Sequence, residues 1–76
     1  MKIKVFAVLK DFMPVESEVE SVSSVSDLIA LLKLNYPDAA TILSQSRVAT
    51  NTAILKLDDN ITAYEELCII PPSSGG

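Results

Sequence analysis

Few of the 76 residues carry side chains that could take part in covalent chemistry. The chain has one cysteine, Cys68, and no histidine, which excludes a disulfide framework, a Cys/His zinc site and a Ser-His or Cys-His catalytic pair. Cys68 stands among apolar neighbours, where a lone cysteine is most simply a small packed hydrophobe. Asp58 and Asp59 are adjacent acids in an expected turn and are most simply solvated. The side chains therefore predict a protein that is not catalytic by itself.

The placement of glycine is the most informative feature of the sequence. A chain of this length would ordinarily hold about five glycines, but this one holds only Gly75 and Gly76. The turns of the folded body must form without glycine, while both glycines stand where folding demands least. The pattern indicates that the last two positions must lack side chains for a purpose outside folding. Chance or an added tail is the simpler alternative.

Composition and charge limit the class of protein. The chain is 49% hydrophobic, which favours one ordered domain over disorder. Its formal net charge of -4 argues against nucleic acid as a partner, since nucleic acid requires a basic face. No apolar run reaches the roughly 18 residues of a membrane-spanning helix, and the first residues lack a signal-peptide cleavage site. We therefore expect a cytoplasmic protein with no membrane partner.

The hydrophobic pattern of the first part predicts a β-hairpin. Residues 2–10 alternate as a strand, and residues 15–22 follow as a second strand. If the two pair, the glutamates of the second strand lie near the lysines of the first. One face of the first strand is expected to point into the core, namely Ile3, Val5, Ala7 and Leu9.

A helix is expected next. Ser24 is a good N-cap residue, and Asp27 three positions later forms a short version of the capping box. Pro37 ends this helix and can begin a short second one. Apolar residues at helical spacing predict one buried stripe, formed by Val25, Leu28, Ile29, Leu32 and Tyr36.

The remaining residues predict the rest of a small sheet. Residues 48–57 suggest two short strands around a turn, with Asn51 the residue most able to take a left-handed conformation. A closing strand ends at Ile70, before two prolines. This order, one main helix on a mixed sheet, predicts the α+β ubiquitin-like roll called the β-grasp fold. We expect this domain to span residues 1–70, followed by a flexible tail at residues 71–76.

The tail Pro71-Pro72-Ser73-Ser74-Gly75-Gly76 resembles the end of the small, sulfur-carrying subunit of molybdopterin synthase, the MoaD family. That family ends in two prolines, two variable residues and Gly-Gly. One position departs from the family pattern, because Tyr64 stands where a glycine is usual before the last strand. The loop there either changes shape or holds Tyr64 in a costly backbone conformation. Other stretches similar to the family are Ile3–Ala7, Val48–Asn51, Ile61–Thr62 and Glu66–Ile70.

The resemblance implies a defined chemistry at Gly76. An activating enzyme, related to those that activate ubiquitin, would use ATP to adenylate the Gly76 carboxylate, and a sulfur donor would convert it to a thiocarboxylate. The large subunit of molybdopterin synthase would then receive the sulfur for a bound pterin precursor. The catalytic groups would lie on these partners, and no cofactor or metal would be bound by this chain. The implied complex is a heterotetramer of two small and two large subunits.

A partner also needs a surface on which to dock. Pro71 and Pro72 would favour an extended tail, Ser73 and Ser74 would be spacers, and Gly75 and Gly76 would pass a narrow channel. Four residues on the open face of the sheet are expected to form the apolar docking patch: Phe6, Val8, Cys68 and Ile70.

Three alternatives remain open. A sulfur carrier for thiazole synthesis or tRNA thiolation would share the tail chemistry and differ in the acceptor. A ubiquitin-like modifier would instead be joined to lysines of target proteins. A plain interaction module would not need Gly76 at all.

Overall fold

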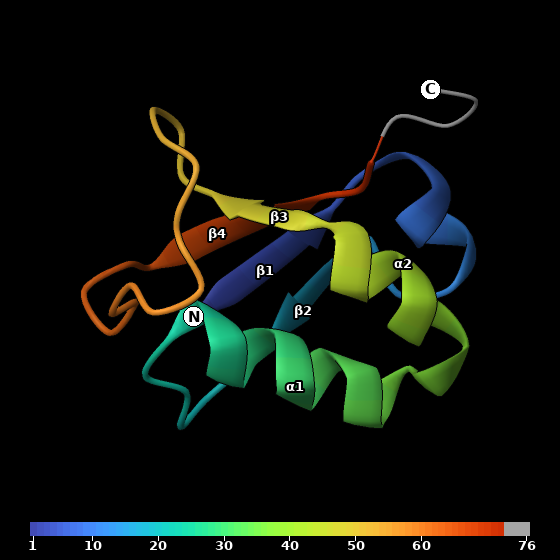
Figure 1. The fold of residues 1–76 in the computed structure, drawn as a ribbon, viewed down its shortest axis with the longest axis horizontal. Coiled ribbons are helices and arrows are strands. Elements are labelled where there is room, and N and C mark those ends of the chain that lie inside the picture. Colours follow the sequence, from blue (N-terminus) through green and yellow to red (C-terminus); the bar gives the residue numbers. More distant parts are fainter. Residues whose placement is uncertain (73–76) are drawn as a thin grey trace.

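One mixed sheet, covered on one face by helices, organises residues 1–72, the part of the chain that this computed structural model describes (Figure 1). The sheet has the strand order β2-β1-β4-β3. The central strands β1 and β4 are parallel, and both outer strands pair antiparallel to their neighbours. The elements in chain order are β1 (Lys2–Val5), η1 (Ala7–Asp11), β2 (Glu16–Glu18), α1 (Val25–Asn35), η2 (Pro37–Ala39), α2 (Ala40–Gln45), β3 (Arg47–Ala49) and β4 (Glu66–Ile70).

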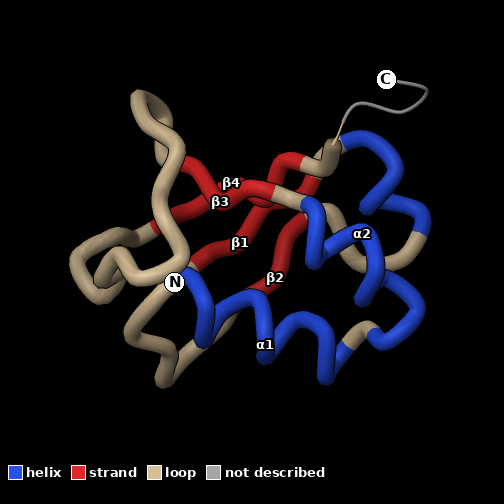
Figure 2. Tube along the Cα trace, viewed as in Figure 1, coloured by secondary structure: helices blue, strands red, loops and turns tan. Residues whose placement is uncertain are grey.

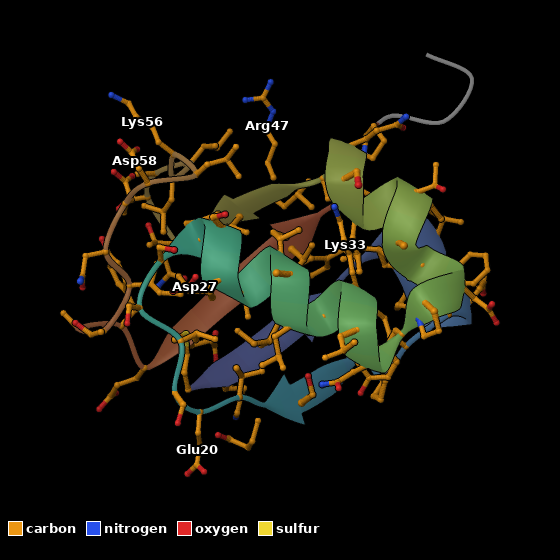
Figure 3. The ribbon with its side chains drawn as sticks, turned by 60° about the horizontal axis from the view of Figure 1, so that its bottom comes forward. Glu20, Asp27, Lys33, Arg47, Lys56 and Asp58 are labelled. Carbon is orange, nitrogen blue, oxygen red and sulfur yellow. The ribbon has the colours of Figure 1, made fainter. Side chains whose placement is uncertain are left out.

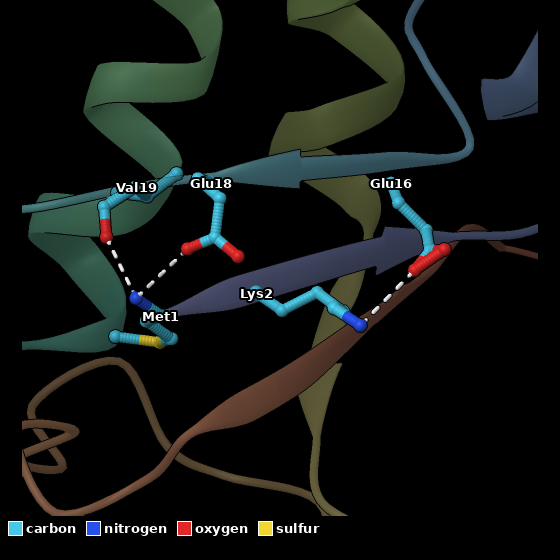
Figure 4. A network of polar contacts seen from close by, with 5 residues as sticks. All are labelled: Met1, Lys2, Glu16, Glu18 and Val19. Atoms are coloured by element: carbon cyan, nitrogen blue, oxygen red, sulfur yellow. Dashed lines mark hydrogen bonds and ion pairs between the residues drawn. The ribbon is translucent and has the colours of Figure 1, made fainter.

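The expected hairpin of the first two strands is confirmed, with charges paired across it. Lys2 lies opposite Glu18 in the register of β1 and β2, and its ammonium lies 3.4 Å from a carboxylate oxygen of Glu16 (Figure 4). The terminal ammonium of Met1 lies 3.4 Å from the Glu18 carboxylate and donates to the carbonyl of Val19 at 3.1 Å. Such exposed pairs contribute at most about 1 kcal/mol each. They fix the hairpin register more than they stabilise the fold.

Both strands of the hairpin are shorter than the sequence predicts. The expected strand over residues 2–10 ends at Val5, because Ala7 takes a left-handed backbone with φ of 53° and turns the chain into η1. The second strand covers only Glu16–Glu18, and Ser21 turns the chain with φ of 65°. Leu9 is buried as expected, but on a 3-10 helix, and Ala7 is exposed rather than in the core. Two non-glycine residues thus supply left-handed turns in a body without glycine.

Helix α1 confirms the capping and the buried stripe read from the sequence. The Oγ atom of Ser24 accepts a hydrogen bond from the backbone N–H of Asp27 at 3.1 Å. The first two helical N–H groups, of Val25 and Ser26, donate to the carbonyls of Asp59 and Leu57 at 3.2 and 2.9 Å. The loop after β3 therefore completes the cap, and no N–H of the first turn is left unsatisfied. Within the stripe, Val25, Leu28, Ile29 and Leu32 are buried, and Tyr36 is half-buried.

Only one of the two strands expected over residues 48–57 forms. After β3 the chain makes a loop (Figure 2). A single bridge joins Ala49 to Ile54. The turn is held by Thr50, whose Oγ1 atom accepts hydrogen bonds from the N–H groups of Thr52 and Ala53 at 3.2 and 3.1 Å. Asn51 has no positive φ, because the threonine hydroxyl closes the turn without a left-handed residue.

The loop before β4 changes shape at Tyr64, so this residue does not adopt a costly backbone conformation. Its φ is not positive, since within residues 1–72 only Ala7 and Ser21 have that conformation among the non-glycine residues. The N–H of Tyr64 donates to the carbonyl of Ile61 at 3.2 Å, closing an ordinary turn. The backbone thus accommodates a bulky residue without left-handed strain.

The core lies between the sheet and the helices. The side chains that are almost fully inaccessible come from β1, η1, α1, α2, β3, β4 and the loop before β4, and they are Ile3, Val5, Leu9, Leu28, Leu32, Leu43, Val48, Ile61, Leu67 and Ile69. No helix within residues 1–72 has the length and apolar character that crossing a membrane requires.

Candidate functional site

The site begins where β4 leaves the sheet toward the tail. Val5 of β1 and Ile69 of β4 are register partners, and the residues that follow them, Phe6 and Ile70, therefore stand side by side at this end of the sheet. Both are exposed. The chain continues from Ile70, the last residue of β4, into Pro71. An apolar surface thus adjoins the point at which the tail departs.

The four predicted docking residues lie on different elements and differ in how exposed they are. Alternation along β4 is confirmed, because Leu67 and Ile69 are buried and Ile70 is exposed. Val8 is also exposed, but it lies on η1 rather than on a strand. Cys68 is a partly buried free thiol on β4.

Cys68 belongs to a different part of the open face. Its register partners are Lys4 on β1 and Ala49 on β3, and Ala49 is itself buried. We call Phe6, Val8 and Ile70 the sheet-end surface, since these three are exposed, Phe6 and Ile70 directly follow the last paired residues of β1 and β4, and Val8 follows Phe6 by two residues. Cys68 lies two residues before Ile70 on β4, nearer the middle of the sheet, and is not part of this surface.

Away from its end, the open face of the sheet is charged rather than apolar. The Lys4 ammonium lies 3.6 Å from the Glu66 carboxylate, next to the Lys2–Glu16 pair. A partner that docks at the sheet end would therefore meet a rim of paired charges below it. Such a rim contributes more to orientation and association rate than to affinity.

Two exposed apolar residues near the same end escaped the sequence analysis. Phe12 follows η1, and Val15 stands just before β2, where its carbonyl accepts a hydrogen bond from Val5 N–H at 3.0 Å. Phe12 falls in the connection expected between the first two strands, and Val15 falls at the start of the expected second strand, so the pattern assigns neither to a docking surface. The available signal was the density of apolar residues between Phe6 and Val15, which is more than a short turn can bury.

The structure describes only two of the six predicted tail residues. Pro71 is half-buried and Pro72 is exposed. Ser73, Ser74, Gly75 and Gly76 lie outside the described residues. Within residues 1–72, no cluster of three or more histidine, cysteine or acidic side chains is arranged to hold a metal ion.

Comparison with known families assigns the chain to a class of protein. A sequence model of the ThiS family matches residues 3–76, which is nearly the whole chain and includes Gly75 and Gly76. The chain belongs to the ThiS family. ThiS proteins are small ubiquitin-like sulfur carriers that are not catalytic alone, which agrees with the poverty of reactive side chains here.

Comparison of folds supports the same architecture. The structure resembles the crystal structure of SAMP1 from Haloferax volcanii, with a TM-score of 0.72 over 99% of this chain and 97% of that chain. The sequences are 24% identical, so the likeness concerns the fold. It confirms the β-grasp architecture expected from the order of the elements. No curated protein matches this ThiS-family chain significantly.

Proposed function

We propose that this ThiS-family protein is the sulfur-carrying small subunit of molybdopterin synthase, working in molybdenum cofactor biosynthesis. The finer assignment is supported by the run Pro71-Pro72-Ser73-Ser74-Gly75-Gly76, which has the MoaD pattern of two prolines, two variable residues and Gly-Gly. Other sulfur carriers need the glycines for the same chemistry. The two prolines are what favours the molybdopterin pathway.

The proposed chemistry takes place at the carboxylate of Gly76. A carboxylate is a poor acyl donor, so one of its oxygens first attacks the α-phosphate of ATP on the activating enzyme. Pyrophosphate leaves and an acyl-adenylate forms. Hydrosulfide supplied by a sulfur donor then attacks the acyl carbon, the bond from that carbon to the AMP oxygen breaks, AMP leaves, and the terminus becomes a thiocarboxylate. Because Gly75 and Gly76 lack side chains, the backbone can pass through a narrow channel to each active site.

The Pro-Pro-Ser-Ser-Gly-Gly run carries the assignment, and the position of the sheet-end surface supports the way in which the tail would be used. Phe6 and Ile70 are exposed side by side where the chain turns into Pro71. A partner bound there holds the tail at its root, and six extended residues span at most about 20 Å. The folded body can therefore remain outside the partner while Gly76 reaches a buried centre. Val8 and Cys68 would extend the same contact.

The proposed partners supply every catalytic side chain. They are an ATP-using adenylating enzyme related to ubiquitin-activating enzymes and the large synthase subunit, with which this chain would form a heterotetramer of two small and two large subunits. The carrier binds neither ATP nor metal itself in this scheme. Thiazole synthesis, tRNA thiolation and protein modification use the same tail with other acceptors, and the ThiS-family assignment is compatible with each.

Sulfur transfer in a purified system tests the proposal. The thiocarboxylated protein is mixed with the large subunit and the pterin precursor, and the pterin is analysed for incorporated sulfur. We expect the dithiolene product, with carboxylate regenerated at Gly76. A chain lacking Gly76 is the matched control, and it should bind the large subunit yet give no product. Sulfur delivered instead to a thiazole precursor or to tRNA, or Gly-Gly remnants on lysines, would contradict the molybdopterin assignment.

A further inference from the structure

A second surface lies between helix α1 and the edge strand β3, which is the edge of the sheet farthest from β2. An open groove of about 740 Å³ runs between α1 and the edge strand β3. Its walls are one side of α1 from Val25 to Lys33, the junction of α2 and β3, and the loop of residues 54–57. We call it the α1–β3 groove. Because β3 is an edge strand, the groove opens at the border of the molecule.

The α1–β3 groove is fixed in shape by hydrogen bonds on both sides of its loop wall. The N–H of Leu55 donates to the carbonyl of Val48 in β3 at 2.8 Å. The carbonyl of Leu57 accepts from the N–H of Ser26 in α1 at 2.9 Å. The loop is therefore tied to both elements that it bridges. A groove formed in advance lowers the cost of ordering when a ligand binds.

Apolar side chains are exposed along the loop wall. Ile54 is 58% exposed and Leu57 is 66% exposed, which is unusual for two large aliphatic residues three positions apart. Leu55 between them is half-buried, and Ile29 of α1 lines the floor. Grouped exposed apolar residues on a small protein indicate a surface that another molecule covers.

The charge of the α1–β3 groove is opposite to that of the whole chain. The chain has six lysines and arginines against ten acids, yet three of those six, Lys33, Arg47 and Lys56, line this one groove. They come from three different elements around it (Figure 3). No aspartate or glutamate is among its lining residues.

The three cations are also without ionic partners inside the described part of the chain. The ion pairs found within residues 1–72 involve Met1, Lys2 and Lys4, all on the side of β1. The nearby acids Asp27, Asp58 and Asp59 are not among the lining residues of the groove, although Asp58 lies near Lys56 (Figure 3). Asp59 accepts the backbone N–H of Lys56 at 2.8 Å, and Asp27 accepts the N–H of Ser23 at 3.4 Å on a different side of α1. The positive charge in the groove is thus available to a ligand.

We infer that the α1–β3 groove binds an acidic segment of a partner protein that also carries aliphatic side chains. Carboxylates would meet Lys33 and Lys56, with Arg47 at the β3 edge of the groove, while aliphatic groups would cover Ile54 and Leu57. Nucleic acid fits less well, because the groove has no aromatic residue for stacking and the whole molecule repels phosphate through its net charge of -4. The proposed binding does not involve the tail chemistry at Gly76.

The test uses a labelled synthetic peptide of alternating glutamate and leucine as the probe, with a lysine-leucine peptide of equal length as its control. We expect saturable binding of the acidic peptide only, and amide resonance changes that centre on residues 54–57 and Arg47. The double variant Lys33→Glu with Lys56→Glu should weaken binding about tenfold or more. Lys10→Glu, a matched reversal of an exposed lysine outside the groove, should change binding less than about twofold.

A second pair of variants separates the apolar contribution from charge. Leu57→Ser should weaken peptide binding, whereas Leu34→Ser, at an exposed leucine of α1 outside the lining, should not. Thermal melts of all variants check that the domain remains folded. Equal weakening by Lys10→Glu, resonance changes that centre on β1 and β2, or tighter binding of single-stranded RNA or anionic lipid vesicles than of the peptide would overturn the inference.

Discussion

The most decisive mutational test of the docking surface uses two adjacent isoleucines of β4. Ile70 is 42% exposed at the sheet end, whereas Ile69 is fully buried against the helices. Ile70→Asp and Ile69→Asp make the same chemical change one residue apart on opposite faces of one strand. The first should remove partner binding from a folded protein. The second should remove the fold.

The expected magnitudes follow from these two environments. At Ile69 the change loses a buried side chain worth about 2–5 kcal/mol and buries an unpaired carboxylate at a cost of several more. A domain of this length has a total stability of roughly 4–11 kcal/mol, so Ile69→Asp should unfold it. At Ile70 the loss should be about 1 kcal/mol, because the side chain is partly solvated and the new carboxylate stands opposite Arg47 in the sheet register.

Binding should respond far more strongly than stability at Ile70. A carboxylate placed in a desolvated apolar contact costs about 2–4 kcal/mol, which is roughly 30- to 1000-fold in affinity. Calorimetric titration with the large synthase subunit measures the affinity, and circular dichroism measures the melting temperature, which should fall by about 4–8 °C. A folded Ile70→Asp variant that binds as the unmodified protein does would refute the docking surface. A folded Ile69→Asp variant would refute the assignment of faces on β4.

Three further predictions concern single side chains. Ser24→Ala should lower the free energy of unfolding by about 1 kcal/mol through loss of the cap to Asp27, while Ser26→Ala should be neutral or slightly stabilising; equal melting temperatures of the two would contradict this reading. Ser21→Gly should raise stability by up to about 1 kcal/mol in urea titrations because it relieves a left-handed backbone, whereas Ser26→Gly inside α1 should lower it; a destabilised Ser21→Gly would count against the strain. Lys2→Ala should change the free energy of unfolding by less than about 1 kcal/mol, and it should lower partner affinity much less than Ile70→Asp does, since the exposed pair with Glu16 lies on the rim. A loss of affinity as large as that of Ile70→Asp would show that the partner binds the charged face instead.

Features with a local signal could be read from the sequence. The cap at Ser24, the helical stripe beginning at Val25 and the break at Pro37 each depend on residues within a few positions of one another, and the structure has all three. The alternation along β4 was equally readable, because Leu67 and Ile69 contrast with Ile70 over a short span. These elements were enough to predict the fold.

Features set by unusual backbone or by distant contacts could not be read in this way. The spacing of Val5 and Leu9 suits both a strand face and one helical turn. Alanine does not favour a left-handed backbone, so the residue type of Ala7 gives no sign of the turn between them. The loop wall of the α1–β3 groove depends on hydrogen bonds to Val48 and Ser26, which are remote from it in sequence. Sequence patterns describe neighbours along the chain, so this groove appeared only in three dimensions.

The mass of the intact protein from its native host tests the central claim most directly. The account predicts a fraction of molecules in which one oxygen is replaced by sulfur, with the change mapped by fragmentation to Gly76. That fraction should disappear when Gly76 is deleted or followed by one more residue, while the melting temperature stays nearly unchanged. Sulfur found on Cys68 in place of Gly76, or full function in the variant extended beyond Gly76, would contradict the account.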